Sequence, residues 1–119
     1  MAGPDGLLYV EEMNTGKLGK YNPKDGSYHP MTVGPLGAEV GVPRVIDGNI
    51  WTTDAIGSTF VTSSVVKIDV ATGKTTEWSL GLRPGSSATD LAAGPDGMLY
   101  ISNGGANTIT AFDPHTGRV

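Results

Sequence analysis

One pattern recurs three times along the chain and limits the fold more than any other feature. Residues 3–10 read Gly-Pro-Asp-Gly-Leu-Leu-Tyr-Val, and residues 94–101 read Gly-Pro-Asp-Gly-Met-Leu-Tyr-Ile. In both copies a second turn ends in glycine 20 residues after the last glycine of the first turn, at Gly26 and Gly117. A looser copy in 47–73 holds five more residues. The copies follow one another at 42 to 49 residues, which is the length of one four-stranded blade of a β-propeller.

The residues of the turns favour short antiparallel strands between them. Asp-Gly is a strong hairpin signal because glycine adopts a positive φ without steric penalty. In 113–117, which reads Asp-Pro-His-Thr-Gly, proline presets φ and glycine closes the turn. β-branched and aromatic residues occur between the turns, and no window shows the apolar spacing of an amphipathic helix. We therefore expect an all-β chain made of consecutive four-stranded antiparallel β-propeller blades.

The repeat divides this single domain into three parts. We expect blade 1 at 1–37, blade 2 at 38–85 and blade 3 at 86–119. Blade 1 lacks most of its first strand and blade 3 lacks its fourth, so ten strands make about two and a half to three blades. The four strands expected in blade 2 are 42–46, 49–54, 65–70 and 75–80. Propellers close with roughly four to eight blades, so the chain is either a fragment of a larger propeller or a unit that completes one as a homo-oligomer.

Composition excludes several kinds of partner and chemistry. The net charge is −4 and the lysines form no basic stripe, which argues against a nucleic-acid partner. No apolar run is long enough to span a bilayer, so no membrane partner is expected. Cysteine is absent, which excludes disulfides and cysteine-ligated zinc. No phosphate-binding loop, nucleophile elbow or zinc-binding His-Glu motif occurs, and we assign no catalytic residue.

A polar residue follows each Asp-Gly turn by five or six positions. These residues are Glu12, Asp54 and Asn103, with Asn14 close to the first of them. Propeller symmetry would place them on one face. Ca²⁺ and Mg²⁺ take their ligands from carboxylate and amide oxygens, so the three residues are candidate metal ligands. The alternative is that each side chain caps the loop that follows it by bonding to local backbone.

Arg44 and Asp90 form a second candidate pair. Each precedes the apolar residue of its blade's first strand, which is the strand nearest a propeller axis. The pair would line the central channel or form a salt bridge, which contributes little when exposed. The candidate binding residues for a small molecule or glycan are therefore Glu12, Asn14, Arg44, Asp54, Asp90 and Asn103.

Aromatic residues also repeat. Tyr9, Trp51 and Tyr100 align at one position of the pattern. We expect them to pack between blades rather than to stack on a ligand, because aromatic side chains dominate core packing. Trp78 and Tyr28 are expected as peripheral covers on the fourth strands.

The additional residues of the second copy lie within 55–62. We expect this insertion to lengthen a loop on the side of the blade that carries Asp54. Phe60 and Val61 would then cover a neighbouring blade or line a cleft.

The repeat resembles that of the streptogramin (virginiamycin B) lyase-like propellers. The segments that carry the resemblance are Gly-Pro-Asp-Gly-x-Leu-Tyr, then Ile-x-x-Phe-Asp-Pro-x-Thr-Gly, and Thr-Glu-Trp-Ser-Leu at 76–80. It extends over nearly the whole chain, and the NHL and YVTN repeats are also similar. The resemblance implies a β-propeller fold. Because family members are often exported, it also implies a periplasmic or secreted protein rather than a cytoplasmic one.

For activity, the resemblance implies a Mg²⁺-dependent lyase that opens a lactone with His and Glu residues in the central face. This chain has two histidines, His29 and His115, both expected at the blade periphery. A lyase of this kind would need its histidines in blades absent from this chain. A binding or scaffold module is therefore the first functional hypothesis, and a lyase-like or lactone-processing enzyme is the alternative.

Overall fold

The computed structural model describes residues 1–12, 15–33, 39–56, 62–81 and 87–119. These residues contain eleven β-strands in three antiparallel sheets and no helix, so the expected all-β class is confirmed. They include no helix that could span a membrane. The first sheet comprises β1 (Leu8–Glu12), β2 (Lys17–Tyr21) and β3 (Tyr28–Thr32). The second comprises β4 (Glu39–Val40), β5 (Arg44–Ile46), β6 (Asn49–Ile56), β7 (Thr62–Ile68) and β8 (Thr75–Ser79), and the third comprises β9 (Ala88–Ala93), β10 (Leu99–Asn103) and β11 (Thr108–Phe112).

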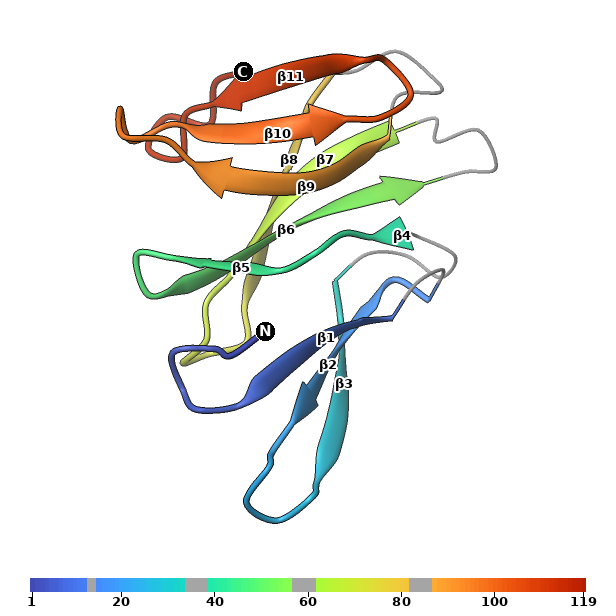
Figure 1. Cartoon of the computed structure of the whole chain (residues 1–119), viewed down its shortest axis with the longest axis vertical. Helices are drawn as coiled ribbons and strands as arrows, with labels where there is room; N and C mark the ends of the chain where they lie inside the picture. Colours follow the sequence, from blue (N-terminus) through green and yellow to red (C-terminus); the bar gives the residue numbers. More distant parts are fainter. Residues whose placement is uncertain (13–14, 34–38, 57–61, 82–86) are drawn as a thin grey trace.

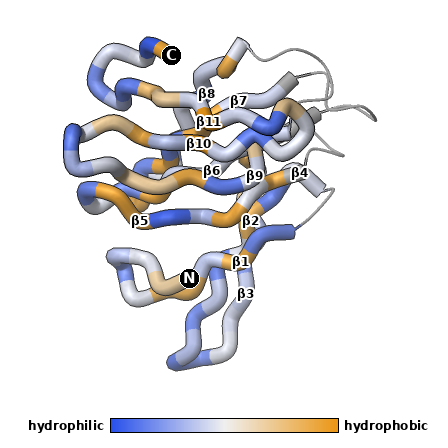
Figure 2. The backbone as a smooth tube through the Cα atoms, turned by 45° about the horizontal axis from the view of Figure 1, so that its top comes forward, coloured by the Kyte–Doolittle hydropathy of each residue, from blue (hydrophilic) through white to orange (hydrophobic). Residues whose placement is uncertain are grey.

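The sheets follow one another in chain order along the longest axis of the molecule (Figure 1). The strand orders are β1-β2-β3, β4-β6-β7-β8 with β5 also paired to β6, and β9-β10-β11. Figure 2 shows hydrophobic stretches on strands of all three sheets.

The first strand expected in the second sheet is interrupted. Val40 pairs with Asp54 and Arg44 pairs with Trp51, so β4 and β5 run along different parts of β6. This gives eleven described strands instead of the ten expected. Between them, a Cβ atom at Gly41 would overlap the Thr53 side chain and a backbone carbonyl of the third sheet. The close approach at Gly41, followed by a proline at 43 without an N–H group, explains the interruption.

The insertion in the second copy lengthens the two strands on either side of it. β6 and β7 pair continuously from Ile50 opposite Ile68 to Ile56 opposite Thr62. Residues 55, 56 and 62 therefore belong to strands, where we expected a loop. Phe60 and Val61 lie outside the described residues.

The Gly-Pro-Asp-Gly segment is built around the tyrosine of the strand that follows it. The Tyr9 hydroxyl donates to Asp5 Oδ2 at 2.6 Å, and Tyr100 bonds to Asp96 in the same way at 2.5 Å. The first residue of the segment must be glycine, because a Cβ atom at Gly3 would overlap the Tyr9 ring. The motif is thus a turn that holds an aromatic ring against the backbone.

Two hydrophobic clusters join the three sheets. One lies between the first and second sheets and contains Tyr9, Leu18, Val33, Val40, Ile50, Val66 and Ile68. The other lies between the second and third sheets and contains Trp51, Val65, Leu80, Ala88, Leu91, Leu99, Ile101 and Phe112. Each cluster combines side chains from two sheets, so the sheets are held together by burial of apolar area.

The repeated aromatic position has different environments along the stack. Tyr9 and Trp51 are 2% and 4% exposed and pack between sheets, as expected. Tyr100 is 38% exposed, which differs from our expectation. The third sheet is the last of the stack, so within this chain no further sheet is described that would cover Tyr100.

Candidate functional site

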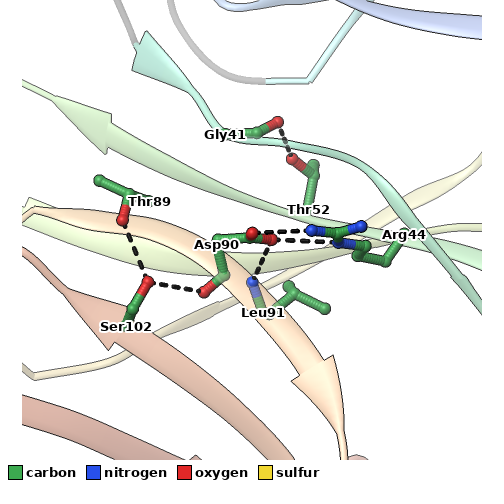
Figure 3. A network of polar contacts seen from close by, with 7 residues as sticks. All are labelled: Gly41, Arg44, Thr52, Thr89, Asp90, Leu91 and Ser102. Atoms are coloured by element: carbon green, nitrogen blue, oxygen red, sulfur yellow. Dashed lines mark hydrogen bonds and ion pairs between the residues drawn. The ribbon is translucent and has the colours of Figure 1, made fainter. Parts of the chain in front are cut away.

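Arg44 and Asp90 form a two-pronged ion pair between the second and third sheets (Figure 3). Arg44 Nε donates to Asp90 Oδ1 at 3.1 Å and Arg44 Nη2 donates to Oδ2 at 2.8 Å. The Leu91 backbone N–H also donates to Asp90 Oδ1, at 2.8 Å. The hydrogen bond from Arg44 lowers the pKa of Asp90 below its ordinary value. The two side chains are 49% and 40% exposed, so the pair is solvated and can still meet a ligand.

Hydroxyl groups extend this polar network (Figure 3). The Thr89 and Ser102 hydroxyls lie 3.1 Å apart, and Ser102 donates to the Asp90 carbonyl at 3.4 Å. On the side of the second sheet, the Thr52 hydroxyl donates to the Gly41 carbonyl at 2.7 Å. Side-chain hydrogen bonds therefore link β9 to β10 beside the ion pair, and link β6 to the residue that follows β4.

A cavity of about 240 Å³ adjoins the ion pair. Arg44, Asp90 and Ser102 form its polar end. Leu91, Tyr100 and Ile109 belong to its apolar wall. Ligand sites commonly combine a mainly apolar wall with a few polar groups that orient the ligand. The volume suits a molecule of about one ring.

The three residues expected on one face lie in three different sheets. Glu12 ends β1 and Asn103 ends β10, whereas Asp54 lies within β6, two residues before its end. Each contacts its own sheet. A hydrogen bond from Tyr28 to Glu12 raises the pKa of Tyr28, and Asn103 Nδ2 donates to Thr110 Oγ1 at 2.7 Å.

The same three residues share an unusual feature. Among the described residues, the buried side-chain oxygens that lack a hydrogen-bond partner are Glu12 Oε2, both carboxylate oxygens of Asp54, and Asn103 Oδ1. Asp54 is fully buried. Burial, and secondarily the carboxylate of Glu77 on β8, raises the pKa of Asp54 to about 7. Asp54 therefore holds its proton until near neutral pH.

The geometry limits how these residues could hold a metal ion. Stacked sheets lie about 10 Å apart, whereas Ca²⁺–oxygen distances are about 2.3–2.6 Å. Each residue would therefore need its further ligands from its own sheet. Within the described ranges, no group of three or more His, Asp or Glu residues is placed to hold a metal. Asp54 and Glu77 are two carboxylates close enough to interact, which is fewer than such a site needs.

The remaining candidates are easily placed. His29 lies on β3 and His115 in the turn after β11, and both are exposed, at the positions expected for them. Neither belongs to the cavity wall. Asn14 lies outside the described residues. Sequence reasoning missed Glu77, because its nearness to Asp54 depends on the register of two successive strand pairs, β6 with β7 and β7 with β8.

Comparisons with known proteins show a likeness in fold. No family model and no curated protein matches the chain. One similar solved structure is the extracellular domain of a protein described as a one-component system of Bacteroides thetaiotaomicron. Its TM-score is 0.69 at 21% identity, over 100% of this chain and 14% of that one. Another is an auxiliary nutrient binding protein of the same organism, with a TM-score of 0.61 at 15% identity, over 97% of this chain and 32% of that one. The chain therefore spans a minor part of the proteins it resembles.

Proposed function

We propose that this chain is a β-propeller segment, with each sheet a blade, and that it acts as a binding or scaffold module. Three consecutive antiparallel sheets and a repeat of blade length support this arrangement. The similarity to virginiamycin B lyase-like repeats remains part of the proposal. Two structural neighbours are an extracellular domain and a nutrient binding protein, which supports binding outside the cytoplasm. The lyase alternative has less support in the described residues, since neither histidine lines the cavity beside the ion pair and His115 lines a separate pocket next to Trp51.

The Arg44–Asp90 pair beside the cavity is the observation that carries the binding proposal. The pair presents a guanidinium and a carboxylate together, and such groups bond the hydroxyls of a sugar in a defined orientation. Tyr100 in the wall supplies an aromatic face for the apolar side of a sugar ring. A monosaccharide unit, free or at the end of a glycan, is the ligand class that fits this combination.

A sugar screen tests this function. Melting temperature and isothermal titration would be measured for the wild type, at protein concentrations low enough for the chain to be monomeric, with a panel of monosaccharides and disaccharides. We expect at least one sugar to bind saturably and to raise the melting temperature, because a ligand that binds the folded state alone stabilises it. The double variant Arg44→Ala/Asp90→Ala, which leaves no unpaired charge, should lose this response, whereas the exposed control Lys74→Ala should keep it. Binding by the double variant at wild-type strength, or no response to any sugar, would reject the proposed site.

A further inference from the structure

Each sheet of the stack has a forward face, which points to the next sheet, and a back face, which points to the previous one. Two positions mark the forward face. One is the repeated aromatic residue. The other is on the next strand, directly opposite the residue that comes two places after the aromatic. In the first sheet these are Tyr9 and Leu18, and in the second they are Trp51 and Val65. All four are at most 4% exposed. The forward face is therefore an apolar contact surface wherever a sheet follows.

The forward face of the third sheet carries the same residue types and is open. By the same register its two positions are Tyr100 and Ile109. They are 38% and 72% exposed. Ile109 thus occupies a position that is fully buried in both other sheets, where Leu18 and Val65 are 0% exposed.

The back face of the first sheet shows the reciprocal pattern. Leu8 and Tyr21 pair across β1 and β2 and are both 36% exposed, and Val10 on the same face is 46% exposed. The residues equivalent to Leu8 and Tyr21 are at most 1% exposed, and they are Ile50 and Ile68 in the second sheet and Leu99 and Phe112 in the third. The chain therefore exposes one forward face and one back face, which are the two halves of a junction that it forms twice internally.

We propose that a second copy of this chain covers these faces, with the third sheet of each copy packed on the first sheet of the other. This inference rests on the proposed propeller arrangement. A copy supplies the complementary face at each end, because forward-on-back is the contact made at both internal junctions. Two copies carry six sheets, which lies within the roughly four to eight blades of closed propellers. A head-to-tail contact that closes in this way gives a discrete dimer rather than a filament.

Sedimentation velocity over a wide range of protein concentration tests the dimer. We expect the wild type to have twice the chain mass of 12.3 kDa. Val10→Asp damages the back face of the first sheet and Ile109→Asp damages the forward face of the third, and each variant alone should be monomeric. An equimolar mixture of the two should dimerise, because one intact forward face meets one intact back face. Val45→Asp, at an exposed valine of the second sheet, is the matched control and should remain dimeric.

The outcomes separate the assembly from the binding function. A wild type that is monomeric at every concentration overturns the proposal, as does a variant that dimerises like the wild type or a mixture that stays monomeric. Far-ultraviolet circular dichroism would establish that each variant is folded. Tyr100 and Ile109 also line the proposed sugar cavity, so a second copy and a sugar compete for this face. The cavity residues are unchanged in Val10→Asp, so sugar titration of this monomeric variant measures the proposed function without the dimer. Sugar binding by a chain that never dimerises would overturn the assembly alone.

Discussion

At the scale of single residues, Asp54 combines full burial with a pKa raised to about 7 from an ordinary value of 3.8. The folded protein therefore keeps a proton that the unfolded chain has already released above about pH 4. Hence the free energy of unfolding must fall as pH rises from about 4 to 7, and Asp54 destabilises the fold most above pH 7. Asp54→Asn removes the ionisation. The free energy of unfolding of the variant, measured relative to that of the wild type, should therefore be higher at pH 8 than at pH 4 by on the order of 2 kcal/mol. Urea denaturation across this pH range measures the difference, and parallel pH profiles would contradict the role given to Asp54.

A second residue-scale prediction concerns the tyrosine of the Gly-Pro-Asp-Gly turn. Tyr9 and Tyr100 make the same hydrogen bond to an aspartate, but Tyr9 is 2% exposed and Tyr100 is 38% exposed. Burial also raises the pKa of Tyr9. A hydroxyl removed from water depends more on its partner, so Tyr9→Phe should cost about 1 kcal/mol of unfolding free energy. Tyr100→Phe is the matched control and should cost clearly less in urea denaturation, since water can replace its bond; equal losses would show that burial is irrelevant.

At the scale of strands and turns, the sequence was informative where structure depends on neighbouring residues. The turn at 113–117 was predicted from its proline and its final glycine. The structure confirms it, because Gly117 takes a φ of 74° and its N–H donates to the Asp113 carbonyl. The junction role of Trp51 followed from its place in the repeat. The interruption between β4 and β5 and the contact of Asp54 with Glu77 were not predicted. Both depend on where separate strands meet, which the order of residues along one strand does not specify.

Trp78 on β8 is the element-scale contact that joins the second sheet to the third. Its ring stacks on Trp51 with centroids 5.7 Å apart and lies 5.5 Å from the Phe112 ring. Trp78→Ala should cost about 2–3 kcal/mol of unfolding free energy, below the full cost of a buried tryptophan because Trp78 is half-buried. Trp78→Phe should retain most of this stability. Urea denaturation measures both losses. The near-ultraviolet circular dichroism signal of the stacked tryptophans should disappear in either variant. An unchanged denaturation midpoint in Trp78→Ala would show that Trp78 does not stabilise the contact between the second and third sheets.

At the scale of the whole molecule, two junctions leave the sheets in unequal positions. The second sheet is covered on both faces, since Ile50 contributes to one cluster and Trp51 to the other. The first and third sheets are each covered on one face. Stability should therefore be greatest in the middle of the stack, because opening the second sheet exposes both apolar clusters while opening an end sheet exposes one.

Amide hydrogen exchange tests this gradient strand by strand. We expect the amides of β6 and β7 to exchange most slowly, and those of β3 and β11, at the edges of the end sheets, to exchange faster. The comparison should be made on Ile109→Asp, where the open forward face of the third sheet has lost its apolar side chain. In the wild type at high concentration, β1, β2, β10 and β11 should gain protection relative to this variant while β6 and β7 stay unchanged, because association covers the end faces alone. Uniform exchange across the three sheets would mean that the stack opens as one cooperative unit, and the unequal burial of its faces would then have no energetic consequence.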